Sequence, residues 1–190
     1  TIYNNEFYRG DYGLAGSGGG TGNVVFHDHP TYGYVCRNAV IRDNYFHTTD
    51  YIGLRLISGR DFEIYRNYFK DCTNAIQMHT NSNVKVYYNV FNLAVGAYSA
   101  QALDAAINAT TGTKTNCSVF NNTFYLGNNH RYGIYSRHSG MSYQNNIFYT
   151  TYNNSSCYPL YVTDNTSPTV SHNCYYNPNH TNRVNWNGVV

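Results

Sequence analysis

The sequence predicts an all-β fold wound as a solenoid, and three observations support this prediction. A phrase made of an apolar residue, two variable residues, Asn, one variable residue and an aromatic residue recurs along the 190 residues. Its copies lie about 22 to 39 residues apart, a period typical of solenoids. A second phrase of small, aliphatic, variable and usually apolar residues follows most copies. We therefore expect one domain over residues 1–190, built from about seven stacked coils.

The first phrase predicts a short strand that runs into a bend. β-branched and aromatic residues favour strands, and Asn tolerates a left-handed backbone, so we expect the asparagine to sit in the bend. At a strand spacing of roughly 4.8 Å, the stacked amides would form a ladder, and the aromatic residues would stack inside. The copies are Ile2–Phe7, Ile41–Phe46, Ile64–Phe69, Val86–Phe91, Val119–Phe124, Tyr143–Phe148 and Val170–Tyr175.

The second phrase predicts a companion strand in the same coil, because its residues alternate as those of a half-buried strand do. Its copies are 53–56, 75–78, 106–109, 133–136 and 159–162. Alignment of these copies gives one outward column of Arg55, Gln77, Asn108, Tyr135 and Tyr161 and a second of His79, Thr110 and Arg137.

Two stretches depart from the regular period, around residues 8–38 and 92–115, and we expect loop insertions there. The first holds a glycine cluster that lacks the GxxxxGK[ST] pattern of a phosphate loop, so tight bends explain it better. It also holds His27, Asp28 and His29, whose two imidazoles would point to the same side of a strand. These three residues are weak metal-ligand candidates, since no residue nearby is evident as a third ligand beside the two imidazoles.

Two or three strands per turn of about 22 residues is the geometry of a right-handed parallel β-helix. Through its Asn-x-Phe ladder and companion strand, nearly the whole chain resembles the pectate-lyase-like β-helix superfamily. The resemblance implies the fold and does not imply one reaction, because this scaffold hosts lyases, hydrolases, epimerases, phage tailspikes and non-catalytic surface proteins.

The composition suits an extracellular or cell-surface solenoid, since only 12% of the residues are charged. A net charge of +2 without basic clusters does not favour nucleic acid or an anionic membrane as a partner. The sequence has no apolar run long enough to span a membrane, and it starts in a repeat rather than in a secretion signal.

Cysteines and asparagines give further expectations for a secreted protein. The five cysteines lack the spacing of a zinc site, and we expect Cys72 and Cys117 to fill core positions. Cys157 and Cys174, in neighbouring coils, are the one pair to test as a disulfide. The candidate glycosylation sites are Asn108, Asn116, Asn121, Asn153, Asn154, Asn165 and Asn179, all of which begin Asn-x-Ser/Thr sequons.

The ten acidic residues are scattered singly, which bears on catalysis. A polysaccharide lyase commonly uses Ca²⁺ held by clustered acids, and hydrolysis commonly uses two facing carboxylates. Asp61 and Glu63 come closest to a pair on one strand face, and Asp43 is expected near Arg66 of the next coil. We therefore expect no cofactor. Ca²⁺ is a candidate only if the protein has a lyase-like activity.

The outward columns hold the candidate site residues. His79, Arg137 and His138 are the candidates for chemistry, and Arg55, Gln77, Tyr135 and Tyr161 are candidates for contact with a carbohydrate. Arg, His and Tyr on a flat wall can hold a sugar chain by stacking and by charge-assisted hydrogen bonds. The alternative is that isolated basic side chains on a β-wall serve solubility. Similarly, Tyr65 and Tyr87 are expected to stack across coils rather than on sugars.

Two interpretations of function follow. The first is a non-catalytic extracellular structural or surface protein that self-associates end to end into a fibre, or forms part of a longer β-helix, because neither end shows a cap. The second is a carbohydrate-active domain, either lyase-like or glycan-binding, with a glycan or polysaccharide as its partner. Turnover or binding of a polysaccharide would separate the two.

Overall fold

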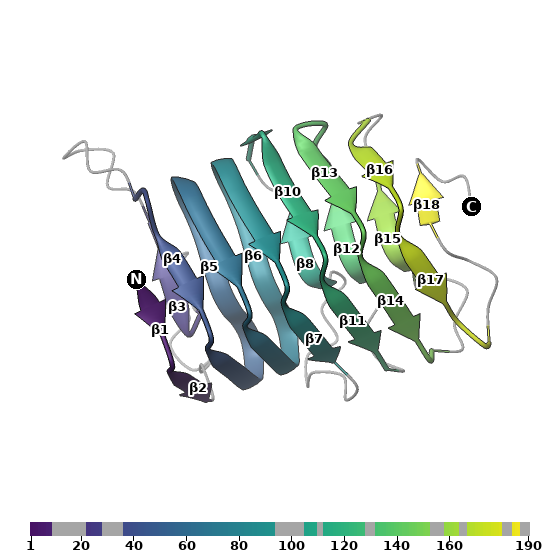
Figure 1. The fold of residues 1–190 in the computed structure, drawn as a ribbon, viewed down its shortest axis with the longest axis horizontal. Coiled ribbons are helices and arrows are strands. Elements are labelled where there is room, and N and C mark those ends of the chain that lie inside the picture. Colours follow the sequence, from purple (N-terminus) through teal and green to yellow (C-terminus); the bar gives the residue numbers. More distant parts are fainter. Residues whose placement is uncertain are drawn as a thin grey trace.

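The strands of successive coils pair in parallel and build a three-sided solenoid (Figure 1). The computed structural model describes residues 1–8, 22–27, 36–93, 105–109, 112–127, 132–152, 158–163, 167–179 and 184–186. All regular elements in these residues are strands, as the sequence predicts. Two of them, β5 (Tyr45–Tyr65) and β6 (Tyr68–Tyr87), bend around the solenoid and contribute to each of its three walls.

Wall A consists of the strands that precede the ladder asparagines. It contains the ends of β5 and β6 with β1 (Ile2–Tyr3), β4 (Val40–Arg42), β10 (Cys117–Phe120), β13 (Met141–Gln144) and β16 (Thr169–Ser171). The short β9 (Lys114–Thr115) pairs with β6 at the edge of this wall.

Walls B and C consist of the strands that follow the ladder. Wall B contains the starts of β5 and β6 with β2 (Glu6–Tyr8), β7 (Val90–Leu93), β11 (Thr123–Leu126), β14 (Ile147–Thr150) and β17 (Cys174–Tyr176). Wall C contains the middles of β5 and β6 with β3 (Val24–Phe26), β8 (Ala105–Ala109), β12 (Tyr132–Ser136), β15 (Tyr158–Val162) and β18 (Val184–Trp186).

The predicted asparagine ladder runs along the inside of the corner between walls A and B. The Asn89 amide shows its geometry, since Nδ2 donates to Asn122 Oδ1 at 3.0 Å and to the Ile64 carbonyl at 2.9 Å. Its Oδ1 accepts from both nitrogens of Asn67. The rungs are Asn5, Asn44, Asn67, Asn89, Asn122, Asn146 and Asn173. Five of these seven rungs lie between two neighbouring coils, and the solenoid has about five turns rather than the seven coils that we expected.

The bend itself differs from the prediction. The ladder asparagines keep ordinary backbone angles, and the left-handed residue is the one before each of them, with φ between 53° and 57°. These residues are Asn4, Asp43, Arg66, Tyr88, Asn121, Asn145 and His172. The ladder amides must point inward to bond the next coil, so the preceding residue makes the turn.

A second, outer ladder was not predicted. It lies at the corner between walls C and A, where Asn83 Nδ2 donates to Asp61 Oδ1 at 2.9 Å and Asn116 Nδ2 donates to Asn83 Oδ1 at 2.9 Å. These three residues and Asn38 all have a left-handed backbone. Here the same residue makes the turn and carries the amide, and the ladder is exposed.

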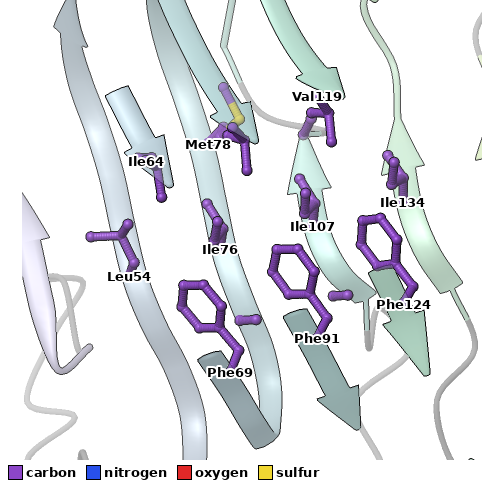
Figure 2. Close-up of a cluster of buried hydrophobic side chains, with 14 of the residues drawn as sticks. Leu54, Ile64, Phe69, Ile76, Met78, Phe91, Ile107, Val119, Phe124 and Ile134 are labelled. Carbon is purple, nitrogen blue, oxygen red and sulfur yellow. The ribbon is translucent and has the colours of Figure 1, made fainter. Parts of the chain in front are cut away.

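Aromatic and aliphatic columns fill the interior (Figure 2). The predicted aromatic stack runs from Phe7 to Tyr175, with neighbouring ring centroids 4.6 to 5.2 Å apart. Opposite it, Leu54, Ile76, Ile107, Ile134 and Leu160 occupy one register position of wall C and are fully buried. Cys72 and Cys117 are buried in this core, as predicted.

Two cross-coil pairs predicted from the sequence are present. Arg66 donates to both carboxylate oxygens of Asp43, at 2.7 and 2.8 Å. Tyr65 and Tyr87 stack with their centroids 5.0 Å apart. Two companion strands were missed, β3 within the expected insertion at 8–38 and β18 near the end of the chain.

Candidate functional site

The predicted outward column lies on wall C. Arg55, Gln77, Asn108, Tyr135 and Tyr161 are register partners in five successive coils. At a strand spacing of about 4.8 Å, the column spans about 19 Å along the solenoid axis. The column alignment made from the companion phrase is therefore confirmed by the strand register.

The companion phrase begins with a small residue because neighbouring coils of wall C lie very close together at that point. A Cβ on Gly53 would lie 2.8 Å from the Ala75 carbonyl oxygen, and one on Gly133 would lie 2.5 Å from the Pro159 carbonyl oxygen. The chain therefore approaches the next coil closely, and the aliphatic residue that follows enters the core. The variable residue then faces outward, which sets the orientation of Arg55 and Gln77.

Three polar side chains of this face come together with atoms that lack partners. Arg55 and Gln77 are register partners, and His79 follows Gln77 by two residues, on the same side of β6. Arg55 Nε, Gln77 Oε1 and His79 Nε2 are buried and have no hydrogen-bond partner. An unsatisfied buried polar atom costs about 1 to 3 kcal/mol. This face, which we call the Arg55 cluster, therefore offers unused donor and acceptor capacity.

The charges that act on His79 in the Arg55 cluster are positive. Burial, together with the charges of Arg55 and Lys114, lowers the pKa of His79 to about 4. His79 is therefore neutral near pH 7 and presents a hydrogen-bonding imidazole, while the positive charge comes from Arg55. A general base works best with a pKa near the working pH, so the His79 pKa suits binding better than proton transfer.

Lys114 is the residue that the sequence did not indicate. It is 4% exposed, pairs in register with Asn81, and burial lowers its pKa to about 8. Because its charge reaches His79, it adds to the positive potential behind the Arg55 cluster. A lysine between repeats usually indicates a solvated turn, so no sequence signal distinguished it.

Arg137 belongs to a different part of wall C. It lies two coils from Gln77, and its guanidinium donates to the Tyr135 hydroxyl at 3.1 Å. Tyr135 packs with Tyr132 and Tyr161, with ring centroids 5.2 Å apart or less, and is only 5% exposed. Tyr135 therefore cannot serve as a sugar platform, whereas Tyr161 keeps part of its surface exposed.

The remaining chemical candidates lie apart from the Arg55 cluster. His138 is half-buried after β12, and its backbone nitrogen donates to Ser136 Oγ at 3.5 Å. His27 is exposed, while Asp28, His29 and Thr110 lie outside the described residues. No group of three or more His, Cys, Asp or Glu side chains in the described part of the chain is placed to hold a metal.

The acidic pair predicted at Asp61 and Glu63 lies at wall A. Both residues line a hollow of about 520 Å³ with Asn38, Asn83 and Lys85. Asp61 belongs to the outer ladder, and Glu63 lies 3.8 Å from Lys85 Nζ and accepts from the Tyr87 hydroxyl at 3.3 Å. The two carboxylates are thus engaged with other side chains rather than facing each other.

Among the sequon asparagines, burial separates the candidates. Asn108 is 4% exposed, which argues against a glycan there in the folded chain. Asn116 and Asn179 are exposed, and Asn121 is half-buried in a bend. Asn153, Asn154 and Asn165 lie outside the described residues, as does Cys157. Its proposed partner Cys174 is exposed and has a free thiol.

Comparisons with known proteins identify a family. A family model described as "Right handed beta helix region" matches residues 1–126, which is most of the chain. The handedness and parallel coils expected from the sequence agree with this match. Neither the curated proteins nor the solved structures give a match. The described residues contain no helix able to span a membrane.

Proposed function

Because the chain belongs to the right-handed β-helix family, we propose that it binds an acidic glycan on the outer face of wall C. The observation that carries this proposal is the Arg55 cluster. Its three unpartnered atoms, Arg55 Nε, Gln77 Oε1 and His79 Nε2, lie on adjacent outward positions. A carboxylate or sulfate beside hydroxyl groups supplies the acceptors and donors that such atoms require.

The shape of wall C favours a polymer over a single sugar. Its outward column repeats once per coil, so an extended chain along the solenoid axis meets a new side chain about every 4.8 Å. The chain would pass from the Arg55 cluster over Asn108 towards Tyr161 and Arg137. Tyr161, half-buried in the tyrosine cluster, offers ring surface for stacking.

Binding, rather than turnover, is the activity that we propose, since the His79 pKa of about 4 is far from that of an efficient base near pH 7. The proposal includes an extracellular location, where such polymers are met. End-to-end assembly into a fibre stays a prediction from the sequence.

The test is affinity electrophoresis of the protein through gels that contain either acidic polysaccharides (polygalacturonate, alginate, chondroitin sulfate) or neutral ones. We expect retardation by at least one acidic polymer, weakened by added salt because charged contacts are screened. Retardation by neutral polymers alone, or by none, would contradict the proposal. Ultraviolet absorbance of an unsaturated product, lost in His79→Ala or Arg137→Ala, would instead support a lyase.

A further inference from the structure

A second hollow, of about 270 Å³, lies where wall C passes into wall A, and we call it the corner hollow. Three chain segments, 58–60, 80–82 and 113–115, contribute its lining. Most of its lining residues are serines and threonines, among them Thr80, Ser82 and Thr113, and Arg60 is also a lining residue. It is separate from the 520 Å³ hollow at Asp61 and Glu63.

Asn81 is the residue in the corner hollow that the fold does not explain. Its backbone is satisfied, because its N–H donates to the Thr113 carbonyl at 2.9 Å and its carbonyl accepts from Cys117 Sγ. Its side chain is 3% exposed, yet neither Nδ2 nor Oδ1 has a partner. Buried amides in folded proteins nearly always have partners, so the two Nδ2 donors and the Oδ1 acceptor remain to be filled here.

The charges around the corner hollow are positive. Arg60 lines it and forms no ion pair with the described residues, and buried Lys114 is the register partner of Asn81. Arg37 bridges to Arg60 through the backbone but is not a lining residue. No Asp or Glu is among its lining residues. The acid next in sequence, Asp61, accepts a hydrogen bond from Asn83 and lines the other hollow.

We propose that the corner hollow is a binding site for a small oxyanion, a carboxylate, sulfate or phosphate group, held by Arg60, the Asn81 amide and the surrounding hydroxyls. Guanidinium, amide N–H and hydroxyl groups all donate to oxyanions, and the guanidinium can do so in a bidentate manner. Asn81 Oδ1 accepts from a hydroxyl of the same ligand or of a lining residue. This site is independent of the glycan proposed for wall C.

The experiment is a titration of the ¹⁵N-labelled protein with sodium acetate, sodium sulfate and sodium phosphate, each against sodium chloride at equal ionic strength. We expect saturable shifts of the Asn81 side-chain amide with at least one of them. Preference for acetate points to a carboxylate ligand, whereas preference for sulfate or phosphate points to a sulfated or phosphorylated one. No saturable shift with any of the three anions overturns the proposal.

Matched variants locate the site. Arg60→Gln should weaken binding about tenfold or more, since it removes a charged hydrogen bond. Arg37→Gln, an exposed arginine beside it that does not line the hollow, should change the affinity less than twofold. Equal losses in both variants would mean nonspecific charge attraction and overturn the site.

Removal of the Asn81 amide distinguishes a ligand site from a structural water. Asn81→Ala should abolish oxyanion binding and leave the urea midpoint without anion unchanged or raised, because the amide contributes no bond to the empty fold. A fall in this midpoint together with a crystal structure in sulfate that shows only water beside Asn81 would contradict the proposal. If Asn81→Ala does not fold, the Arg60→Gln and Arg37→Gln pair still decides.

Discussion

Tyr88 occupies a backbone conformation that suits asparagine far better than tyrosine. Its φ is 53°, and it precedes the ladder residue Asn89, as Asn4, Asn121 and Asn145 precede theirs. Its side chain is 58% exposed and makes an edge contact with Tyr87. A bulky residue in this region costs of order 1 kcal/mol or more, and little packing offsets that cost.

Replacement of Tyr88 by asparagine should therefore stabilise the protein. We expect Tyr88→Asn to raise the free energy of unfolding by about 0.5 to 1 kcal/mol, measured by urea denaturation. Tyr88→Ala, which removes the same ring without favouring a left-handed backbone, is the control and should not be stabilising. If Tyr88→Ala has the same free energy of unfolding as Tyr88→Asn, the gain in stability comes from removal of the ring and not from the backbone preference of asparagine.

Lys114 gives a pH-dependent prediction at the same scale. Its pKa falls from 10.5 in the unfolded chain to about 8 in the folded one, because burial penalises the charge. Between pH 8 and pH 10.5 the unfolded chain holds the proton that the folded chain has lost, so stability should rise with pH there. Below pH 8 Lys114 is protonated in both the folded and the unfolded chain, so the cost of burying its charge does not change with pH.

The variant Lys114→Met should remove this pH dependence and raise the free energy of unfolding at pH 7 by about 1 to 3 kcal/mol. Urea denaturation at pH 7 and pH 10 measures both effects. Lys85→Met, which replaces an exposed lysine of wall A, should leave the pH profile as it is. If the free energy of unfolding changes with pH in the same way in the parent and in Lys114→Met, Lys114 is solvated in the folded protein.

At the scale of the element, the two ladders differ in what they contribute. Of the inner amides, that of Asn89 is buried and bonds to two neighbouring coils and to its own strand. The outer amide of Asn83 is exposed, and it donates one bond to Asp61 and accepts one from Asn116. We expect burial to make the inner ladder far more stabilising, since water replaces an exposed hydrogen bond at little cost.

A pair of variants tests this difference. Asn89→Ala leaves the Oδ1 of Asn122 and the backbone and amide nitrogens of Asn67 short of partners, and should lower the free energy of unfolding by about 3 kcal/mol or more. Asn83→Gly removes an outer amide while suiting the left-handed backbone, and should cost less than about 1 kcal/mol. Similar urea midpoints for the two variants would refute the distinction.

The elements predicted from the sequence are those with a repeated chemical reason. An asparagine in every coil must meet another asparagine, and a small residue is needed where the coils of wall C lie very close together, so both phrases could be recognised in the sequence. The strands β3 and β18 were missed because Val24 and Val184 follow no small residue. The register of Arg55 with Gln77 was predictable, but the burial of Tyr135 and Lys114 was not. The alternation of residues along a strand predicts which side of the wall a side chain lies on, but it does not predict which neighbouring side chains cover it.

At the scale of the whole molecule, the outer surfaces of the three walls carry different chemistry. Wall A presents the outer amide ladder and stacked rings such as Tyr65 and Tyr87. Wall B exposes apolar side chains, including Ile147 and Tyr176 in its C-terminal strands. The exposed basic residue Lys70 lies on the same wall, nearer the N-terminal strands. Wall C holds the Arg55 cluster. Unpartnered buried donors are costly, so this wall is where a ligand contributes most.

The central claim is that an acidic glycan binds to wall C through the Arg55 cluster. Its most direct test is isothermal titration calorimetry with an oligosaccharide of the polymer that retards the protein. We predict that Arg55→Gln weakens binding about tenfold or more, while Lys70→Gln, an exposed lysine of wall B, changes it less than twofold. Equal affinities of the parent and Arg55→Gln, or equal losses in both variants, would contradict the claim.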